Sequence, residues 1–225
     1  MQVIIQCSPA YAIAYCYLTA GEFMRAESGA MAFMSSGVQV RSEAGPGGVI
    51  KGLMRSKLAG ESFFMTRYVA EVEGAWVAVA PKFPGDVTPV EITEDTGLFV
   101  QSGSVLALSQ QLNDDVRMAR MGNIAMHEGA VMQHVNGTGT MVLATYGGLQ
   151  CVTLGDGESL VVDTGHLVAF GDKMRFKVGP LGGVVTAALS GEGLVAQIQG
   201  PGTLYLQTRA EAALHNWLLP DRHKR

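Results

Sequence analysis

Three glutamates stand at corresponding places along the chain and are the first candidates for chemistry. Each lies next to a glycine, in Gly60-Glu61-Ser62, His127-Glu128-Gly129 and Gly191-Glu192-Gly193. In a ring, these three carboxylates would form a circle able to bind cations or a polar ligand. In the structural alternative, each carboxylate accepts backbone N–H bonds at the start of a turn. We favour the structural alternative, since equivalent positions in repeats usually serve folding, and keep Glu61, Glu128 and Glu192 as weak ligand-binding candidates.

Three histidines, His127, His134 and His166, are candidate metal ligands. Metalloenzymes with a double-stranded β-helix place two histidines one residue apart, so that both side chains face one metal ion. The chain has no His-x-His pair, and on one strand the spacing of His127 and His134 would point them to opposite faces. We therefore assign no metal ligand and no cofactor.

Hydroxyl residues precede glycine at Ser28, Ser102 and Thr164, but no Gly-x-Ser-x-Gly nucleophile elbow surrounds any of them. The glycine-rich stretch 45–48 lacks the Lys-Ser or Lys-Thr of a phosphate-binding loop. We assign no catalytic residue. A hydrolase triad assembled from distant residues stays open as an alternative.

The same hydroxyl–glycine motif repeats along the chain and predicts its organisation. The three copies are Glu27-Ser28-Gly29, Gln101-Ser102-Gly103 and Asp163-Thr164-Gly165, each followed by an apolar run. We infer three tandem β repeats, 1–84, 85–146 and 147–209, with a short helix and tail at 210–225 that complete one compact unit. The motif residues with an expected structural role are Gly29, Gly103, Gly165, Asp163 and Gly202.

Local patterns favour short strands joined by tight turns. Asp156-Gly157 separates Leu149–Leu154 from Ser159–Val162, and Asn136-Gly137 separates 131–135 from 140–145, which predicts two hairpins. Helical spacing predicts a short helix over 50–58 and another over 210–219, where Pro220 ends it. The predicted fold class is all-β, an antiparallel sandwich or double-stranded β-helix. We expect the C-terminal helix to dock on the sheet or on a neighbouring copy.

Composition limits the partners that the chain can have. Charged residues make up 16% of the chain, and its net charge is −4, so it has no broad basic surface for nucleic acid. Apolar content is high, yet no run reaches the ~18–20 residues that span a bilayer. Because this apolar excess needs cover, we expect a homo-oligomer. The three cysteines, in no C-x-x-C pair, indicate free thiols, and the lack of a basic region before residue 25 favours a cytoplasmic location.

The chain resembles an uncharacterised bacterial family related to the mitochondrial-biogenesis (altered inheritance of mitochondria) proteins. The motifs that carry the resemblance are 21–22, 27–31, 60–63, 84–86, 162–170 and 200–203; the chain departs from the family pattern mainly at His127-Glu128-Gly129. The resemblance implies a fold like the tryptophan RNA-binding attenuator protein, repeated three times per chain, and a homotrimer whose nine repeats form a ring. It implies no activity.

These observations leave three hypotheses about function. The leading one is a non-enzymatic, homo-oligomeric β scaffold that binds a protein partner or a small ligand. The second is RNA or small-ligand binding at the rim of a trimeric ring; net acidity counts against RNA. The third is a cryptic enzyme of the β-helix type.

Overall fold

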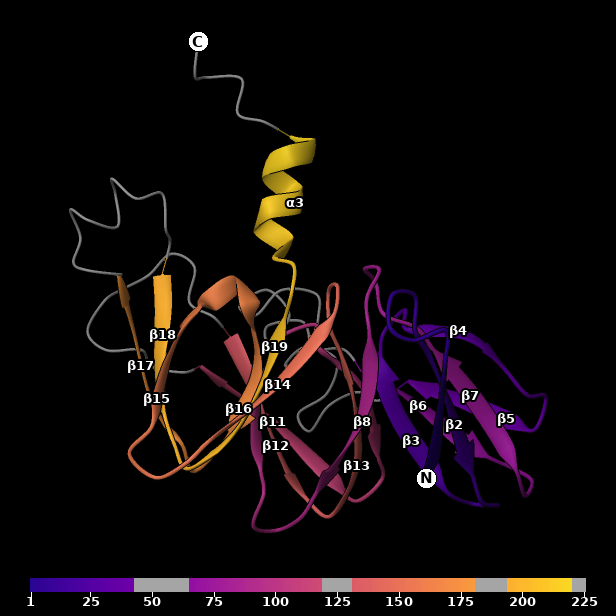
Figure 1. Cartoon of the computed structure of the whole chain (residues 1–225). Helices are drawn as coiled ribbons and strands as arrows, with labels where there is room; N and C mark the ends of the chain where they lie inside the picture. Colours follow the sequence, from indigo (N-terminus) through magenta and orange to yellow (C-terminus); the bar gives the residue numbers. More distant parts are fainter. Residues whose placement is uncertain (43–64, 119–130, 181–193, 220–225) are drawn as a thin grey trace.

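The computed structural model describes residues 1–42, 65–118, 131–180 and 194–219, and these form an all-β structure with one short helix (Figure 1). The strands fall into three consecutive sets of six, preceded by β1 (Gln2–Gln6). The first set is β2 (Ile13–Leu18), β3 (Phe23–Glu27), β4 (Met31–Met34), β5 (Val38–Ser42), β6 (Met65–Ala70) and β7 (Ala75–Val79). The second set is β8 (Val87–Ile92), β9 (Leu98–Gln101), β10 (Val105–Ser109), β11 (Leu112–Met118), β12 (Val131–Gly137) and β13 (Gly139–Ala144). The third set is β14 (Leu149–Leu154), β15 (Ser159–Asp163), β16 (Leu167–Gly171), β17 (Arg175–Pro180), β18 (Leu194–Gln199) and β19 (Gly202–Gln207).

Strand pairing follows one rule within each set. The sixth strand pairs with the first and the third, and the fifth pairs with the second and the fourth. All these pairs are antiparallel, and the third strand of every set carries a bulge against the sixth. Each set therefore forms two half-sheets of three strands, and the three sets share one topology.

Neighbouring sets are joined by a strand pair between them. The second strand of the first set, β3, pairs with the third strand of the second set, β10; β9 pairs with β16 in the same way. These junctions merge half-sheets into two six-stranded sheets, β5-β6-β3-β10-β13-β8 and β11-β12-β9-β16-β19-β14. The two remaining sheets, β1-β2-β7-β4 and β15-β18-β17, lie at opposite ends of this arrangement (Figure 1).

Alternating burial along the strands places the core between the sheets. In β2, Ala14, Cys16 and Leu18 are buried while the residues between them are partly exposed. One apolar cluster lies in each set, and the clusters continue across the junctions: Leu106 of β10 packs in the first cluster, and Val168 of β16 packs in the second. Each set thus completes the core of the set before it.

The predicted turns form, but they do not make hairpins. Gly137 and Gly157 have positive φ, +109° and +78°, as a tight turn requires. However, β14 pairs with β19 and β15 pairs with β18, so the Asp156-Gly157 turn carries the chain from one sheet to another. The Asn136-Gly137 turn does the same between β12 and β13. The hairpin prediction was wrong because turn chemistry sets a chain reversal, whereas the pairing partner is set by distant strands.

The C-terminal helix is confirmed as α3 (Glu211–Leu218). It does not dock on the described sheets: none of its residues is buried, Trp217 is 77% exposed, and the helix extends from the end of β19 away from the strands (Figure 1). The helix predicted over 50–58 lies outside the described residues. Among the described residues, no helix is long and apolar enough to cross a membrane.

Candidate functional site

The three candidate carboxylates from the sequence, Glu61, Glu128 and Glu192, lie outside the described residues, as does His127. All three glutamates fall between the fourth and fifth strands of their sets, since β5 ends at Ser42, β11 at Met118 and β17 at Pro180. Their common place in the topology agrees with their spacing in the sequence. Whether they bind a ligand stays a prediction.

Of the three candidate histidines, the two that the structure describes lie in separate hydrogen-bond groups. His134 on β12 has Nε2 2.9 Å from Asp172 Oδ2, and the Asn136 amide nitrogen lies 3.3 Å from its Nδ1. His166 donates from Nδ1 to the Gln207 carbonyl oxygen at 2.7 Å. Among residues that the structure describes, no group of three His, Cys, Asp or Glu side chains is arranged to hold a metal ion.

The repeated hydroxyl–glycine motif forms the turn between the second and third strands of each set. Gly29 and Gly103 have positive φ, +89° and +83°, where a residue with a side chain is strained. Gly165 instead lies in a single 3-10 turn, η2 (Thr164–His166), which Asp163 caps by accepting a bond from Gly165 N at 2.7 Å. A Cβ on Gly165 would lie 3.0 Å from Ala210 Cβ. The third motif therefore keeps its glycine next to the start of the C-terminal segment, not in a left-handed turn.

Gly202, the last of the motif residues, begins β19 with a φ of +152°. A Cβ built there would lie 2.7 Å from both Cγ and Sδ of Met174. This glycine is therefore required by close packing as well as by backbone conformation.

A surface depression lies at the junction between the first and second sets. It brings together the ends of β3, β7, β13 and β19, the turn before β10, and the first residue of α3. The residues lining it are Glu27, Pro81, Lys82, Phe83, Ser102, Gly103, Ser104, Ala144, Thr145, Tyr146, Gln207 and Glu211. Residues of two of the repeated motifs thus line the depression, and carboxylate, ammonium and hydroxyl groups surround it.

Electrostatics in the depression centre on Glu27. Burial raises the pKa of its carboxyl above the usual value; the Lys82 ammonium opposes this, and the Glu211 carboxylate adds to it. Lys82 itself lies 5.8 Å from the centre of the Phe83 ring. A half-buried carboxylate beside a second one favours a cationic group or a hydrogen-bond donor as its ligand.

Comparison with known proteins identifies a protein family that matches almost the whole chain. The model of the family described as mitochondrial biogenesis AIM24 matches residues 3–209, which include strands β2 to β19 and all of β1 except its first residue. The chain belongs to this AIM24 family. The family resemblance inferred from the motifs is thereby confirmed.

Two relatives of this AIM24-family chain come from Streptococcus pyogenes. An uncharacterised protein of serotype M6 is 24% identical over 189 residues, which are 81% of this chain and 75% of that protein. A crystal structure of a protein from the same species matches with a TM-score of 0.79 and 23% identity, covering 96% of this chain and 97% of that one. The structural match shows a shared fold. The names of these two relatives state no biochemical function, so the function of this AIM24-family chain is argued from its own geometry.

Reasoning from the sequence missed most of the depression. Glu27 belongs to a repeated motif, but the sequence pattern indicated a role for the glycine of that motif and none for its carboxylate. Lys82 and Tyr146 follow the sixth strands in segments without a recognisable pattern. Strand register alone brings these residues to one place, and register is not visible in a single AIM24-family sequence.

The free thiols expected from the sequence differ in their surroundings. Cys16 is fully buried in β2, and burial raises its pKa to about 12. Cys7 and Cys151 are exposed. Burial also raises the pKa of Cys151, which lies on β14. None of the three is in a disulfide.

Proposed function

We propose that this chain is a non-enzymatic, homo-oligomeric β scaffold that assembles head to tail through the edges of β4 and β15 and binds a small ligand at its junctions. The observation that carries the proposal is the repeated junction between sets. Twice within the chain, the second strand of one set pairs with the third strand of the next. The third strand of the first set, β4, and the second strand of the last set, β15, each stand at the end of a sheet.

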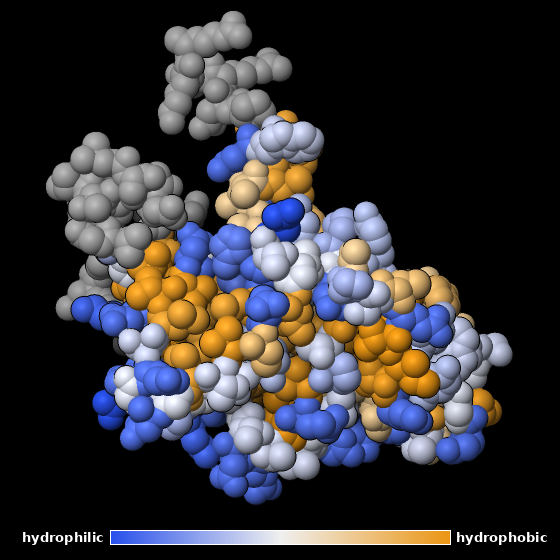
Figure 2. Space-filling model, viewed as in Figure 1, coloured by the Kyte–Doolittle hydropathy of each residue, from blue (hydrophilic) through white to orange (hydrophobic). Residues whose placement is uncertain are grey.

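Burial at equivalent positions supports the pairing of β4 with β15 of another copy. Ala107 and Ala169, which lie opposite β3 and β9, are fully buried, whereas their counterpart on β4, Phe33, is 45% exposed. On β15, Val161 is 52% exposed. Figure 2 shows apolar surface over the part of the third set where Figure 1 places β15. An apolar strand edge left uncovered is a hazard that proteins normally remove.

The two intrachain junctions also fix the register of the proposed contact. Ala107 lies opposite Ala26, and Ala169 lies opposite Val100. By the same alignment Phe33 lies opposite Val162 of the next copy, and Met34 lies opposite Val161. A head-to-tail contact of this kind generates a ring when the rotation closes, and we propose closure after three chains.

Light scattering on the purified chain tests the assembly. We expect a trimer at micromolar concentration, and a monomer would overturn the proposal. Phe33→Lys and Val161→Lys place a positive charge on one edge each and should both prevent ring closure. Val72→Lys is the matched control, because Val72 is an exposed apolar residue (53%) in the turn between β6 and β7 and away from both edges.

Mixing the two edge variants tests the head-to-tail geometry itself. The Phe33→Lys chain keeps a normal β15, and the Val161→Lys chain keeps a normal β4. Their mixture should therefore form a complex of one copy of each that grows no further, because the two altered edges both carry a positive charge and repel each other. If β4 instead paired with β4, the Val161→Lys chain would assemble as the wild type does, and the proposed geometry would be wrong.

A further inference from the structure

The side chain of Gln207 fills the junction between the second and third sets. Its Oε1 accepts a hydrogen bond from Tyr146 N at 2.9 Å, and its Nε2 donates to the Gly165 carbonyl oxygen at 2.9 Å. A primary carboxamide thus joins the chain that follows β13 to the glycine turn before β16. Both partners are backbone groups, so the contact depends on the backbone path and not on the side chains of Tyr146 and Gly165.

The junction between the first and second sets has the same backbone path with a different residue at the centre. Gln207 lies opposite Leu149, the first residue of β14, and Ala144 lies opposite Val87, the first residue of β8. Ala144 is thus the counterpart of Gln207. By the same alignment Lys82 corresponds to Tyr146, and Gly103 corresponds to Gly165.

The methyl group of Ala144 cannot form the two hydrogen bonds that the Gln207 carboxamide forms at the other junction. Ala144, Lys82 and Gly103 all line the depression described above. Within the described part of the chain, neither the Lys82 N–H nor the Gly103 carbonyl has a hydrogen-bond partner. The depression therefore presents one donor and one acceptor. At the next junction, the corresponding donor and acceptor are bridged by the carboxamide of Gln207.

Charged groups at the rim restrict the rest of the ligand. Glu27 and Glu211 are two carboxylates against the single ammonium of Lys82, so the rim has an excess of negative charge. The Glu27 carboxylate accepts no hydrogen bond from any other described residue. A ligand with an ammonium group would supply the missing donor and balance the charge.

We propose that this depression binds a small molecule that carries a primary carboxamide and an ammonium group. The carboxamide oxygen accepts from Lys82 N–H, its nitrogen donates to the Gly103 carbonyl, and the ammonium lies towards Glu27 and Glu211. This inference rests on the proposed binding role and names its ligand class. Because such a ligand has few atoms, its dissociation constant is expected to be about millimolar.

Three matched probes test the ligand chemistry by calorimetric or NMR titration. The probe 5-aminopentanamide has both groups, pentanamide lacks the ammonium, and 5-aminopentanoate has a carboxylate in place of the carboxamide. We expect 5-aminopentanamide to bind the full chain. The dissociation constants of the two other probes should be higher by about tenfold or more. Equal binding of 5-aminopentanoate, or no binding of 5-aminopentanamide at tens of millimolar (about tenfold above the expected constant), would overturn the proposal.

Two variants test the location. Ala144→Gln should fill the first junction with its own side chain, as Gln207 does at the second, and should abolish binding. Ala144→Ser leaves the volume open and should bind as the wild type does. Unchanged binding by a folded Ala144→Gln chain would place the site elsewhere and overturn the inference.

The outcome is separable from that of the assembly proposal. Light scattering on the same samples reports the oligomeric state without the probe. A monomer that still binds 5-aminopentanamide would overturn the scaffold proposal alone. A trimer that binds none of the probes would overturn the ligand proposal alone.

Discussion

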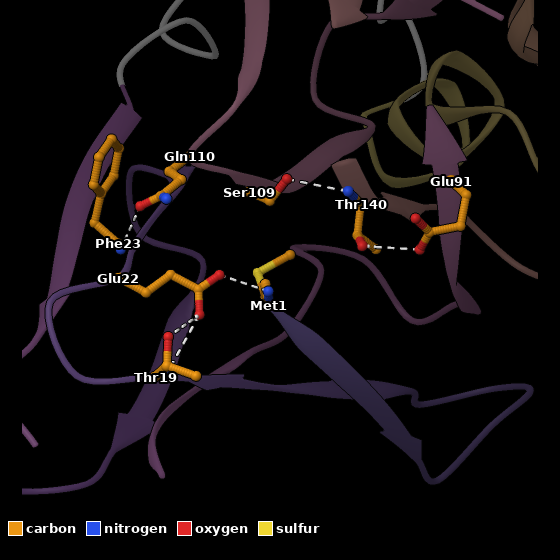
Figure 3. Close-up of polar contacts among 8 residues, drawn as sticks. All are labelled: Met1, Thr19, Glu22, Phe23, Glu91, Ser109, Gln110 and Thr140. Atoms are coloured by element: carbon orange, nitrogen blue, oxygen red, sulfur yellow. Dashed lines mark hydrogen bonds and ion pairs between the residues drawn. The ribbon is translucent and has the colours of Figure 1, made fainter. Parts of the chain in front are cut away.

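Arg25 on β3 forms an ion pair with Asp114 on β11, and the same guanidinium donates to the Leu112 carbonyl oxygen. The two side chains are 14% and 15% exposed. Strands of the first and second sets are thus joined by a partly buried charge pair in addition to the β3–β10 pairing. Figure 3 shows further polar contacts in this region, including Phe23 N donating to the Gln110 side chain across the same junction.

Asp114→Asn should weaken the junction between the first and second sets. Removing the carboxylate leaves the Arg25 guanidinium partly buried without its counter-charge, which should lower the free energy of unfolding by about 1.5–3 kcal/mol. Denaturant unfolding measures this change. Asp115→Asn is the control, because Asp115 is exposed on the same strand, and it should change stability by about 0.5 kcal/mol or less. Equal effects of the two substitutions would show that the ion pair contributes nothing.

Gly85→Ala should destabilise the chain strongly. Gly85 forms a bridge with Gly147 between the starts of the second and third sets, and a Cβ on Gly85 would lie 1.7 Å from the Thr145 carbonyl oxygen. Since backbone would have to move, we expect a loss of about 3 kcal/mol or more in thermal or denaturant unfolding. Gly179→Ala is the matched control: no heavy atom of the described residues lies within 4 Å of a Cβ built there, and the substitution should be neutral or slightly stabilising. An unchanged melting temperature for Gly85→Ala would contradict the close approach.

Strand positions were predictable from the sequence, whereas strand partners were not. The predicted segments Leu149–Leu154 and Ser159–Val162 match β14 and β15 to within one residue. Alternation and turn residues are local properties, so they locate strands well. Pairing of β14 with β19 brings together residues far apart in the chain, and this choice is made by packing across the whole structure.

The residues of the candidate site were even less predictable from the sequence than the strand partners. Ser102-Gly103 was visible as a repeated motif, and Gln207 was not. The significance of Ala144 appears only when strand register aligns it with Gln207 and shows a side-chain carboxamide at one junction and a methyl group at the other. A single sequence contains both residues but not the alignment that relates them.

Thiol reagents should distinguish Cys16 from the other two cysteines. Cys16 is fully buried and its pKa is raised to about 12, so the reactive thiolate is scarce and inaccessible. Titration with a chromogenic disulfide at neutral pH should therefore report two reactive thiols in the folded chain and three after unfolding. The Cys7→Ser, Cys151→Ser double variant should be unreactive until it unfolds. Rapid reaction of that folded variant would show that Cys16 is accessible.

Glu22 should make stability depend on pH at the acidic end. Its carboxylate accepts bonds from the N-terminal ammonium of Met1 at 2.5 Å and from Thr19 N at 3.0 Å (Figure 3). Burial alone would raise the pKa of Glu22, but these contacts outweigh it and lower the pKa below the usual value. Because the folded pKa lies below the unfolded one, the contribution is fully present above about pH 4.3 and is lost as the pH falls through the folded pKa.

Glu22→Gln measures this contribution against pH. At pH 7 the variant should be less stable than the wild type by about 1 kcal/mol, since the ion pair is partly exposed. The difference should shrink as the pH falls below about 4.3, because protonation of Glu22 removes the same charge that the substitution removes. Glu71→Gln, which alters an exposed carboxylate in the turn after β6, should follow the wild type at every pH. A constant difference between Glu22→Gln and the wild type across this range would mean that the charge of Glu22 does not stabilise the fold.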